Sequence, residues 1–357
     1  MVNPRKVLQV LWSGDMGGSE RCAHELARHL PDYGFDSTVC FLTCPSVLGP
    51  VLAAEGIPSF SLGMRNGLDA FALRKLRTYL ENEKFDIIHE HGGNKLAVHA
   101  YRHYSPQSKT LFTIHNGEPA DSYKWLRLRA EISKMRAFDR VLCVSRVRAA
   151  EWEAKTGRPV FYEPNGIDTD RFPVQSSVSP DFPLITVGRL IESKRTGLLI
   201  SLLADFLKRT GKKLWIVGDG PERENIERQI RGASLEKSVS LLGDRNDVPI
   251  LMKQASIFVT ASRIEAFPLA VLEASCAGLP VVAMKNDGVG AVAVNGITGF
   301  IVETEADFLP FVERLFADDI IRFKMGTSAR ARIMENFSLP HYVSRIAAHY
   351  EMLLGES

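Results

Sequence analysis

The sequence predicts an α/β protein with two doubly wound parallel sheets. Short apolar runs typical of buried strands alternate with longer amphipathic stretches typical of helices along most of the chain. The chain has 357 residues, which is long for one hydrophobic core, so two domains are expected. A stretch rich in Pro and Ser at residues 171–180 separates two series of strand-like runs. We therefore place an N-terminal domain at residues 1–170 and a C-terminal domain at residues 181–339.

The elements follow from the apolar pattern. The first series begins with a strand at residues 7–12 and an amphipathic helix at residues 21–30. Its further strands are expected at residues 38–42, 58–62, 86–89, 110–115, 140–145 and 160–163. The strands of the second series are expected at residues 184–187, 213–217, 239–242, 257–260, 280–283 and 299–302. Since strands alternate with helical stretches in both series, each domain is predicted to be Rossmann-like. An apolar-striped pattern at residues 340–354 predicts a C-terminal helix.

The loop after the first strand is rich in glycine. Residues 13–20 read SGDMGGSE, which is not the Gly-x-Gly-x-x-Gly spacing, and no acidic residue closes a second strand at the required distance. Dinucleotide binding is therefore disfavoured. Paired glycines let the backbone approach a ligand closely, and the alternative is an ordinary tight turn.

Composition is that of an ordinary globular protein. Hydrophobic residues make up 45% and charged residues 24%, and the net charge of +2 gives no support to nucleic-acid binding. No apolar window reaches the roughly eighteen residues that a membrane span needs. We therefore expect a cytoplasmic protein that is neither secreted nor membrane-spanning.

The cysteines are odd in number and scattered through apolar segments. They are Cys22, Cys40, Cys44, Cys143 and Cys276. This pattern predicts reduced core thiols in a cytosolic protein. Cys40 and Cys44 lack a second pair at zinc-finger spacing, so a metal site is not expected there.

The most informative stretch is residues 262–282, which read SRIEAFPLAVLEASCAGLPVV. A buried strand ends just before it, and a helix is expected to begin near Pro268, which suits a first helical turn because it has no N–H to leave unpaired. Free amides at such a helix start form a cradle for phosphate. Glu265 and Glu273, with seven residues between them, place carboxylate acceptors beside that cradle. A nucleoside diphosphate sugar has the matching diphosphate and hydroxyl groups.

This stretch also carries a resemblance. Glu265 and Glu273, with Phe267-Pro268-Leu269 between them and residues 278–282 (GLPVV) after them, resemble the signature of the retaining family 4 glycosyltransferases, also called glycosyl transferases group 1. The resemblance covers nearly the whole chain and implies a GT-B fold, in which two Rossmann-like domains face a central cleft. It implies an acceptor-side N-terminal domain and a nucleotide-sugar-binding C-terminal domain, with a C-terminal helix at residues 340–357 crossing back to the first domain.

The resemblance also assigns roles to single residues. Arg189 and Lys194 follow the first strand of the second domain, where ligands of open α/β sheets bind, and resemble the family's diphosphate-holding cations. Catalytic roles are implied for His115, Arg189, Lys194 and Glu265. Donor binding is implied for Gly17, Gly18, Arg189, Lys194, Gly243, Arg245, Glu265, Ala266, Phe267, Pro268, Leu269 and Glu273. Acceptor-side roles are implied for Glu20, His91 and Asn165.

Several features have simpler interpretations. The loop at residues 241–248 resembles the one that faces the nucleotide base, yet Asp247 within it equally suits a helix N-cap. His89 and His91 form a His-x-His pair, but no third ligand is evident at metalloenzyme spacing, and we expect the two rings to point to opposite faces of the strand. Asp168 and Asp170 form an Asp-x-Asp pair that is most simply turn chemistry. No metal site and no cofactor are predicted.

One departure from the family pattern concerns the loop after the strand at residues 280–283. The family usually has Gly-Gly, two residues and then Glu, whereas residues 287–291 read DGVGA. The expected carboxylate is absent at Ala291. The sequence therefore does not specify whether this loop contacts the donor sugar.

Residues 124–158 are locally basic. They contain ten Lys and Arg against four Asp and Glu, an excess of six positive charges, with Trp125, Leu128, Ile132, Met135 and Phe138 at helical spacing. A basic amphipathic helix of this kind suits an anionic membrane surface. A core-facing stripe with a solvated basic face is an equally good interpretation.

The sequence thus predicts a retaining, metal-independent glycosyltransferase. It is expected to move a hexosyl or N-acetylhexosaminyl unit from a UDP- or GDP-sugar to a hydroxyl of a glycan or lipid-linked acceptor, in cell-envelope polysaccharide or glycolipid assembly. The expected location is the cytoplasm, with peripheral attachment to the inner face of the membrane as an option. A GT-B nucleotide-sugar epimerase and a non-catalytic sugar-nucleotide binding protein are the alternatives. Base, sugar, acceptor and linkage are not specified by the sequence.

Overall fold

The computed structural model describes residues 4–15, 17–66, 69–92, 95–118, 120–174 and 182–355. The chain divides into two compact units. The first comprises Met1–Gly166 together with Leu339–Ser357, and the second comprises Ile167–Ser338. Residues 167–170, which we assigned to the N-terminal domain, thus belong to the second unit. Most of the predicted linker, residues 175–180, lies outside the described residues.

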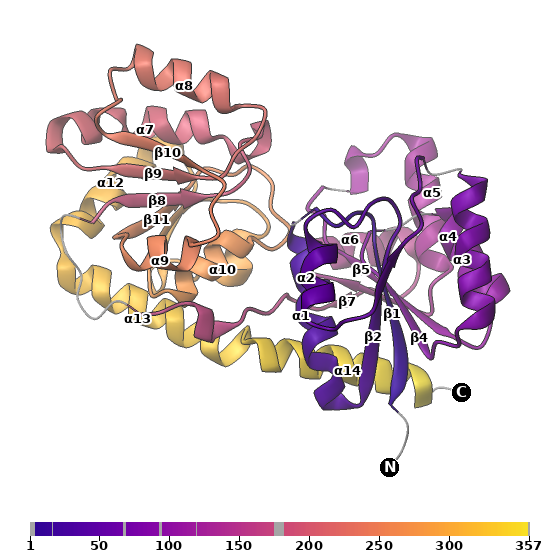
Figure 1. Ribbon diagram of the computed structural model, residues 1–357. Helices are drawn as coiled ribbons and strands as arrows, with labels where there is room; N and C mark the ends of the chain where they lie inside the picture. The colour runs from indigo at the N-terminus through magenta and orange to yellow at the C-terminus, as the bar shows by residue number, and fades with distance from the viewer. Residues whose placement is uncertain are drawn as a thin grey trace. The chain divides into compact units, whose positions relative to one another are not determined.

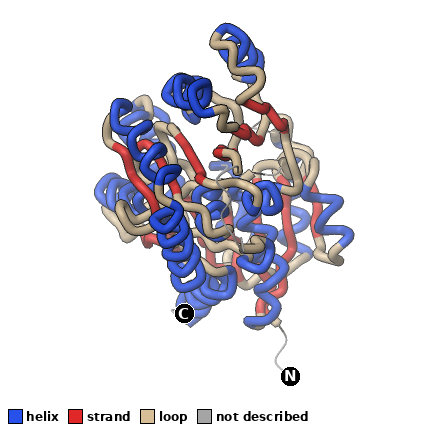
Figure 2. The backbone as a smooth tube through the Cα atoms, turned by 90° about the vertical axis from the view of Figure 1, so that its left-hand side faces the viewer, coloured by secondary structure: helices blue, strands red, loops and turns tan. Residues whose placement is uncertain are grey.

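The first unit alternates strands and helices (Figures 1 and 2). Its strands are β1 (Arg5–Leu11), β2 (Phe35–Phe41), β3 (Ser59–Ser61), β4 (Ile87–Glu90), β5 (Lys109–Ile114), β6 (Arg140–Cys143) and β7 (Phe161–Tyr162). Its helices are α1 (Gly18–His29), α2 (Leu48–Ala54), α3 (Ala70–Asn82), α4 (Lys95–Tyr104), α5 (Trp125–Arg136), α6 (Arg146–Thr156) and α14 (Leu339–Gly355), with short 3₁₀ turns η1 (Leu30–Tyr33) and η2 (Ala120–Ser122).

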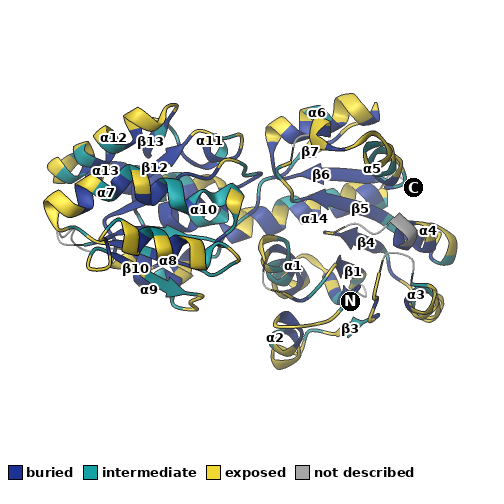
Figure 3. Ribbon diagram, turned by 90° about the horizontal axis from the view of Figure 1, so that it is seen from above, coloured by how far each residue is buried: buried dark blue, intermediate teal, exposed yellow. Residues whose placement is uncertain are grey.

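The described strands of this unit form one parallel sheet in the order β3-β2-β1-β4-β5-β6-β7. Side chains alternate between the two faces, because successive residues of a strand point to opposite sides. Leu8 and Val10 of β1 pack in the cluster that includes α3, α4, α5 and α6. Val7 packs on the opposite face with α1 and α14. The sheet is therefore covered on both sides, as parallel sheets require (Figure 3).

Helix α14 returns the end of the chain to the first unit. Tyr342, Val343, Ile346 and Tyr350 are all buried against strand and α1 side chains of this unit. These residues recur at intervals of three and four, so one face of the helix is apolar. The helix thereby covers the middle of the sheet from the side opposite α3 and α4.

The second unit has the same alternation of strands and helices. Its strands are β8 (Leu184–Val187), β9 (Leu214–Val217), β10 (Val239–Gly243), β11 (Ile257–Thr260), β12 (Val281–Met284) and β13 (Gly299–Val302). Its helices are α7 (Thr196–Thr210), α8 (Arg223–Gly232), α9 (Val248–Lys253), α10 (Leu269–Cys276), α11 (Val289–Val292), α12 (Glu305–Ala317) and α13 (Asp319–Asn336), with 3₁₀ turns η3 (Thr169–Arg171) and η4 (Glu192–Lys194). Among the described residues the parallel sheet has the order β10-β9-β8-β11-β12-β13.

The predicted fold class is confirmed: both units are doubly wound parallel α/β structures. Three strands of the second unit, at residues 184–187, 257–260 and 299–302, have the predicted bounds. Apolar side chains of α7, α8 and α12 form the core on one face of that sheet. Two strands of the first unit differ more: β2 begins three residues before the predicted 38–42, and β7 keeps only two residues of the predicted 160–163. As an edge strand it pairs only with β6 in the sheet.

The five cysteines are free thiols. Four are buried, and burial raises the pKa of Cys22, Cys143 and Cys276 to about 12. Cys44, which we expected in the core, is exposed because it follows the end of β2 in a loop. None of the described helices is both long enough and apolar enough to cross a membrane.

Helices α10 and α13 cross with almost no space between their backbones. Gly278, which follows α10 with a left-handed φ of 81°, lies against Gly326 of α13. A Cβ atom added to Gly326 would lie 2.0 Å from the carbonyl oxygen of Gly278. This contact holds α10 on the body of the unit, so it supports the turn that carries the glutamates.

We expect Gly326→Ala to lower the free energy of unfolding by about 1–3 kcal/mol, because backbone and not a flexible side chain must move to admit the methyl group. Gly232→Ala is the matched control, since a Cβ there meets nothing within 4 Å. At that helical position the substitution should be neutral or stabilise by roughly 0.5–1 kcal/mol. Urea unfolding of both variants measures the difference. Equal stabilities would contradict the close helix crossing.

Candidate functional site

The centre of the second sheet is a topological switch point. β8 is followed by β9 on one side and has β11 on its other side, so the connections leaving β8 and β11 diverge above the carboxyl ends of these strands. Ligands of open α/β sheets bind in the crevice at such a point. Arg189 and Lys194 lie in the segment after β8, and Glu265 lies in the segment after β11.

Lys194 and Glu265 form the central contact of this crevice. The Lys194 Nζ donates to Glu265 Oε1 at 2.6 Å, across 71 positions of sequence. The side chains are 28% and 15% exposed, so the pair is partly shielded and still reachable from solvent. A second bond fixes the two segments, because the backbone N–H of Arg263 donates to the Ser193 carbonyl at 2.8 Å. Arg189, in the same segment after β8 as Lys194, is exposed.

The turn after Glu265 leads directly into α10. Pro268 is the N-cap of this helix, and its carbonyl accepts bonds from the N–H groups of Val271 and Leu272. Within the described residues the N–H groups of Ala266 and Phe267 donate no hydrogen bond. Amides free at a helix start suit a phosphate oxygen. Glu273 lies inside α10 and is 9% exposed.

The loop after β10 contains Gly243 and Arg245. The Arg245 guanidinium binds the Asp247 carboxylate through two bonds, at 2.8 and 2.6 Å. Its hydrogen bonds hold the pKa of Asp247 below the ordinary value. Asp247 is the N-cap residue of α9, but its carboxylate makes no capping bond because Arg245 occupies it.

The loop at residues 287–291, where the family's carboxylate is absent, is held by hydrogen bonds from α13. The carbonyl groups of Ala291 and Val292 both accept bonds from Arg332 of α13 at 2.9 Å. Asn286 also accepts from the N–H groups of Gly288 and Val289 and donates to the Ser262 carbonyl. The side chains of Arg332 and Asn286 therefore hold this loop through its backbone groups.

A second group of predicted residues lies at the carboxyl edge of the first sheet. Gly17 is the N-cap of α1, and Glu20 in its first turn accepts a bond from Ser19 at 2.9 Å. His91 follows β4 and His115 follows β5. Asn165 follows β7 and is 4% exposed, and its Oδ1 has no partner among the described residues. An unpaired buried acceptor of this kind suits a ligand donor.

His91 and His115 are in direct contact. Nδ1 of His91 lies 3.1 Å from Nε2 of His115. The expectation that His89 and His91 point to opposite faces is wrong: their ring centroids are 4.0 Å apart, because residues two apart on a strand share a face. Burial lowers the pKa of His115 to about 4, and burial together with the neighbouring rings lowers the pKa of His89 and His91 well below 6.5.

Metal ligation has no visible basis in the part of the chain that the structure describes. No group of three His, Cys, Asp or Glu side chains is arranged to hold an ion there. The Asp-x-Asp pair is a turn, in which Asp168 Oδ1 accepts from the N–H of Asp170 at 3.1 Å.

The residues that sequence reasoning missed are those around the histidines. Gln9 of β1, Thr113 of β5 and Tyr350 of α14 all bind His89 or His91. Gln9 is the polar residue within the apolar part of β1, residues 7–11, and that was a usable signal. Tyr350 gave no comparable signal, because an aromatic residue on the apolar face of a helix is ordinary.

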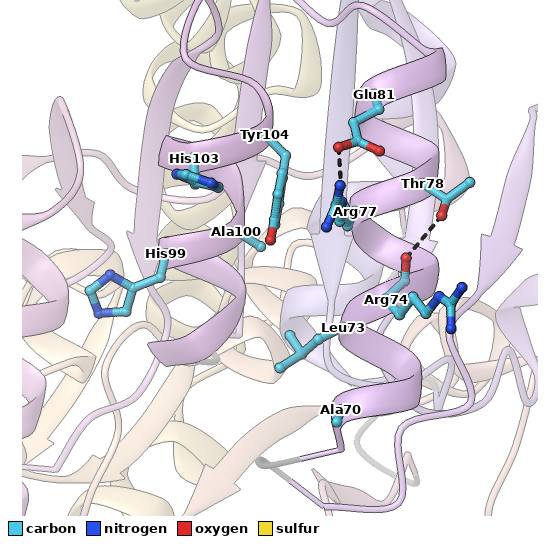
Figure 4. Close-up of a pocket in the computed structure, with 10 residues that line it drawn as sticks. All are labelled: Ala70, Leu73, Arg74, Arg77, Thr78, Glu81, His99, Ala100, His103 and Tyr104. Atoms are coloured by element: carbon cyan, nitrogen blue, oxygen red, sulfur yellow. Dashed lines mark hydrogen bonds and ion pairs between the residues drawn. The ribbon is translucent and has the colours of Figure 1, made fainter.

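A cavity of about 740 Å³ lies elsewhere, between α3 and α4 (Figure 4). Its exposed lining includes Arg74, Arg77 and His99, and the Arg77 guanidinium lies over the ring of Tyr104 while binding Glu81 at 2.8 Å. None of the predicted site residues lines it. This cavity is therefore separate from the candidate site.

Two family profiles match the chain, one for each sheet. Residues 16–171 match the profile of Glycosyltransferase Family 4, and residues 168–332 match that of Glycosyl transferases group 1. The chain is a family 4 glycosyltransferase. The switch-point residues Lys194 and Glu265 fall inside the second profile.

Two curated relatives and one solved structure illustrate what this glycosyltransferase is similar to. The UDP-Gal:alpha-D-GlcNAc-diphosphoundecaprenol alpha-1,3-galactosyltransferase of Escherichia coli is 25% identical over 94% of this chain and 94% of that protein. The N-acetyl-alpha-D-glucosaminyl L-malate synthase of Bacillus anthracis is 28% identical over 48% of this chain and 46% of its own. Anabaena HepE, solved in complex with UDP and glucose, aligns with a TM-score of 0.84 at 20% identity over 98% of this chain and all of that one. The likeness in structure identifies the GT-B fold.

The neutral histidines make stability depend on pH. Unfolded His115 takes up a proton below its ordinary pKa of 6.5, whereas folded His115 takes it up only near pH 4. Between these values the unfolded state binds more protons, so the free energy of unfolding rises with pH. The contribution of His115 is fully present above pH 6.5 and is lost towards pH 4, on the order of 3 kcal/mol.

We therefore expect His115→Asn to flatten the rise of the unfolding midpoint between pH 4 and 7. Thermal unfolding at several pH values measures it, with His99→Asn, an exposed histidine of α4, as control. Parallel pH profiles for the wild type and His115→Asn would contradict the lowered pKa.

Proposed function

We propose that this glycosyltransferase transfers a hexosyl or N-acetylhexosaminyl unit from a nucleoside diphosphate sugar to a hydroxyl acceptor with retention of configuration. The Lys194–Glu265 pair above the switch point of the second sheet is the observation that carries the proposal. The pair joins an ammonium, which suits a diphosphate, to a carboxylate, which suits sugar hydroxyls, and this supports the proposal. Family membership supports the reaction class.

The chemistry follows from where charge develops. As the bond from the anomeric carbon to the diphosphate breaks, negative charge grows on the leaving phosphate, and Arg189, Lys194 and the amides of Ala266 and Phe267 are the groups proposed to stabilise it. Glu273 is proposed to bind the ribose, and Glu265 the transferred sugar. Attack then occurs on the face that the diphosphate leaves, and the departing phosphate accepts the acceptor's proton. This gives retention without a covalent sugar-enzyme intermediate.

The proposed reaction needs no metal ion, since the arginine, lysine and amide donors supply the positive charge that a divalent cation supplies in other enzymes. His115 is proposed to contact the donor sugar. Gly17, Gly18 and Arg245 remain proposed donor contacts, with Gly243 shaping the base-facing loop. Glu20, His91 and Asn165 remain proposed for the acceptor side.

The donor is proposed to be a UDP-sugar. The Escherichia coli relative is named for UDP-Gal, and HepE was solved with UDP. The acceptor is proposed to be a glycan or lipid-linked hydroxyl, since the same relative acts on a diphosphoundecaprenol-linked sugar. Assembly of a cell-envelope polysaccharide or glycolipid is the setting that these chemistries share.

A donor screen tests the proposal. The protein is incubated in EDTA with UDP-, GDP- and ADP-sugars, with and without lipid-linked and free glycans, and nucleoside diphosphate release is measured. Acceptor-dependent release from a UDP-sugar is expected. Release of free sugar or an epimer without an acceptor would indicate the epimerase alternative. Binding without turnover would indicate a binding protein, and activity restored only by manganese would overturn metal independence.

Lys194→Ala should lower turnover by about 10²–10³, because the lost contact acts mainly on charge that develops in the transition state. Lys285→Ala is the matched control: Lys285 also pairs with a glutamate at 2.6 Å in the same unit, but with exposed Glu303. The transfer rate and the unfolding midpoint of both variants separate catalysis from stability. Wild-type turnover in Lys194→Ala would reject its assignment.

The two glutamates should differ in nucleotide binding. Glu273→Gln should weaken free nucleoside diphosphate by about tenfold, the worth of one hydrogen bond to a charged group. Glu265→Gln should leave that affinity unchanged or raise it, because it frees Lys194 from a carboxylate competitor, while transfer falls. Calorimetry with the diphosphate and the transfer assay give both numbers. Equal losses of affinity would contradict the division of roles.

Membrane attachment is proposed for a smaller surface than the sequence suggested. Lys134 is 6% exposed and pairs with Glu131, Arg148 pairs with Glu151, and Arg158 donates to three backbone carbonyl groups. These charged groups are therefore engaged in contacts within the protein. At the start of α5, Trp125 is 64% and Leu126 is 74% exposed. Exposed Lys124, Arg127 and Arg129 lie beside them in sequence. We propose this α5 tip, residues 124–129, as the contact with anionic lipid.

The α5 tip should bind anionic vesicles at low salt and release them at high salt. Each Lys or Arg near such a surface contributes about 1 kcal/mol, and the Debye length falls from about 10 Å at 0.1 M salt to about 3 Å at 1 M. Co-sedimentation is measured for the wild type and for a protein with Arg127→Gln and Arg129→Gln. Arg228→Gln with Arg231→Gln removes the same charge from exposed positions of α8 as a control. Equal sedimentation of both variants would remove the α5 tip from consideration.

A further inference from the structure

The turn that carries Glu265 is held by the neighbouring loop at residues 286–292. This loop follows β12, contains α11 and lies beside α10 in the second unit (Figure 3). Turn and loop are joined at three points. These are the Ser262 carbonyl, the backbone at Glu265 and Ala266, and the ring of Phe267.

The side-chain amide of Asn286 makes the first contact. Its Nδ2 donates to the Ser262 carbonyl at 3.0 Å, and its Oδ1 accepts from the N–H groups of two loop residues, Gly288 at 3.1 Å and Val289 at 3.0 Å. A backbone N–H only donates and a carbonyl only accepts, so the amide has one satisfactory orientation. Turning it over would place its NH₂ group against two donors. Asn286 therefore joins the backbone of the loop to the start of the turn.

Gly288 brings the backbone of the loop into direct contact with that of the turn. A Cβ atom added to Gly288 would lie 2.6 Å from the carbonyl oxygen of Glu265 and 2.9 Å from that of Ala266. The φ of Gly288 is −89°, which any residue can adopt. The close contact, and not the backbone conformation, therefore requires glycine at this position.

The ring of Phe267 makes the third contact. It packs against Phe337 at the end of α13, with the ring centroids 5.5 Å apart. The Arg332 guanidinium lies 5.4 Å from the centroid of Phe337 and donates to two carbonyl groups of the loop. The turn and the loop thus share one support on α13.

We propose that Asn286 and Gly288 are positioning residues, which fix the turn so that the Glu265 carboxylate and the free amides after it meet the nucleoside diphosphate sugar. The proposal rests on the proposed function for what the turn binds, but the position of the turn is a property of the unliganded protein. A displacement of about 1 Å at such groups can lower a rate on the order of 10²-fold. None of the three contacts uses the side chain at residue 291, so the loop holds the turn with alanine there.

Asn286→Asp tests the bond to the turn. The carboxylate still accepts from both loop amides, and aspartate is as good a cap as asparagine, so the unfolding midpoint should stay at the wild-type value. It has no proton to donate and places an acceptor against the Ser262 carbonyl, so the turn should loosen. Asn295→Asp is the matched control. Asn295 also accepts from a backbone N–H, that of Ile301 at 3.0 Å, and the substitution adds the same charge to the same unit.

Hydrogen exchange of the unliganded full-length protein measures the turn directly. The N–H of Arg263 donates to the Ser193 carbonyl, so its exchange reports opening of the turn. Exchange of the peptide covering residues 262–268 should be faster by roughly two- to tenfold in Asn286→Asp, the worth of one hydrogen bond, and unchanged in Asn295→Asp. Equal exchange in the two variants overturns the proposal, whether or not transfer activity is found.

Gly288→Ala tests the backbone contact. Gly290→Ala is the matched control in the same helix, because a Cβ atom there meets nothing within 4 Å. Exchange of the peptide covering residues 262–268 should be faster in Gly288→Ala and unchanged in Gly290→Ala. Equal exchange in this pair contradicts the role of Gly288, and Asn286→Asp remains decisive if Gly288→Ala fails to fold.

Kinetics separate positioning from a purely structural role. In Asn286→Asp we expect kcat/KM for transfer to fall about tenfold, the worth of one hydrogen bond, at an unchanged unfolding midpoint. Asn295→Asp should match the wild type in both. A wild-type kcat/KM in Asn286→Asp, with faster exchange of the turn, would overturn the proposal. A wild-type protein that neither binds a nucleoside diphosphate nor transfers a sugar would reject the proposed function instead, and the exchange comparison would still decide what holds the turn.

Discussion

Parallel strands that are covered on both faces leave only the ends of the sheet for polar chemistry, and both groups of functional residues in this protein follow from that constraint. The helices of each unit bury the two faces of its sheet, so apolar side chains fill the strands. Loops leave at the carboxyl ends, where β8 and β11 in one unit and β1 and β4 in the other diverge. Lys194 and Glu265 occupy the first of these positions, and the segments around Glu20 and His91 occupy the second. The sheet therefore brings together residues that no local structure joins.

The interior of the first unit also contains fully buried polar side chains. Gln9, His89 and Tyr350 are fully buried polar groups in a layer of aliphatic side chains. Burying such groups is unfavourable unless they bind one another, and each of them does. A buried network whose members are bonded to one another also makes the core around it more rigid. Helix α14 supplies the tyrosine, which ties the end of the chain to the geometry of the site edge.

Some charged side chains of this protein make contacts that stabilise the fold, and others are free on the surface. Lys134 and Arg148 are buried and pair with the partly exposed Glu131 and Glu151. Arg332 of α13 binds the carbonyl groups of the loop that lacks the family's carboxylate. A guanidinium that serves two carbonyl groups can fix a loop without an acidic partner. The loop that has Ala291 where the family usually has a carboxylate is therefore still held in place, through its own backbone carbonyl groups.

The sequence by itself determined the strands, the division into two α/β sheets and the family. Apolar runs at residues 184–187 and 257–260 became β8 and β11 unchanged, because fully buried parallel strands need continuous apolar side chains. The Pro268 turn also followed from local chemistry, since a residue without an N–H suits a helix start. Which residues meet was decided by tertiary structure. Lys194 and Glu265 lie 71 positions apart, and Gln9 and Tyr350 lie 341 apart, so no pattern of spacing links them. Burial of Lys134 and exposure of Cys44 depend on neighbours from other elements.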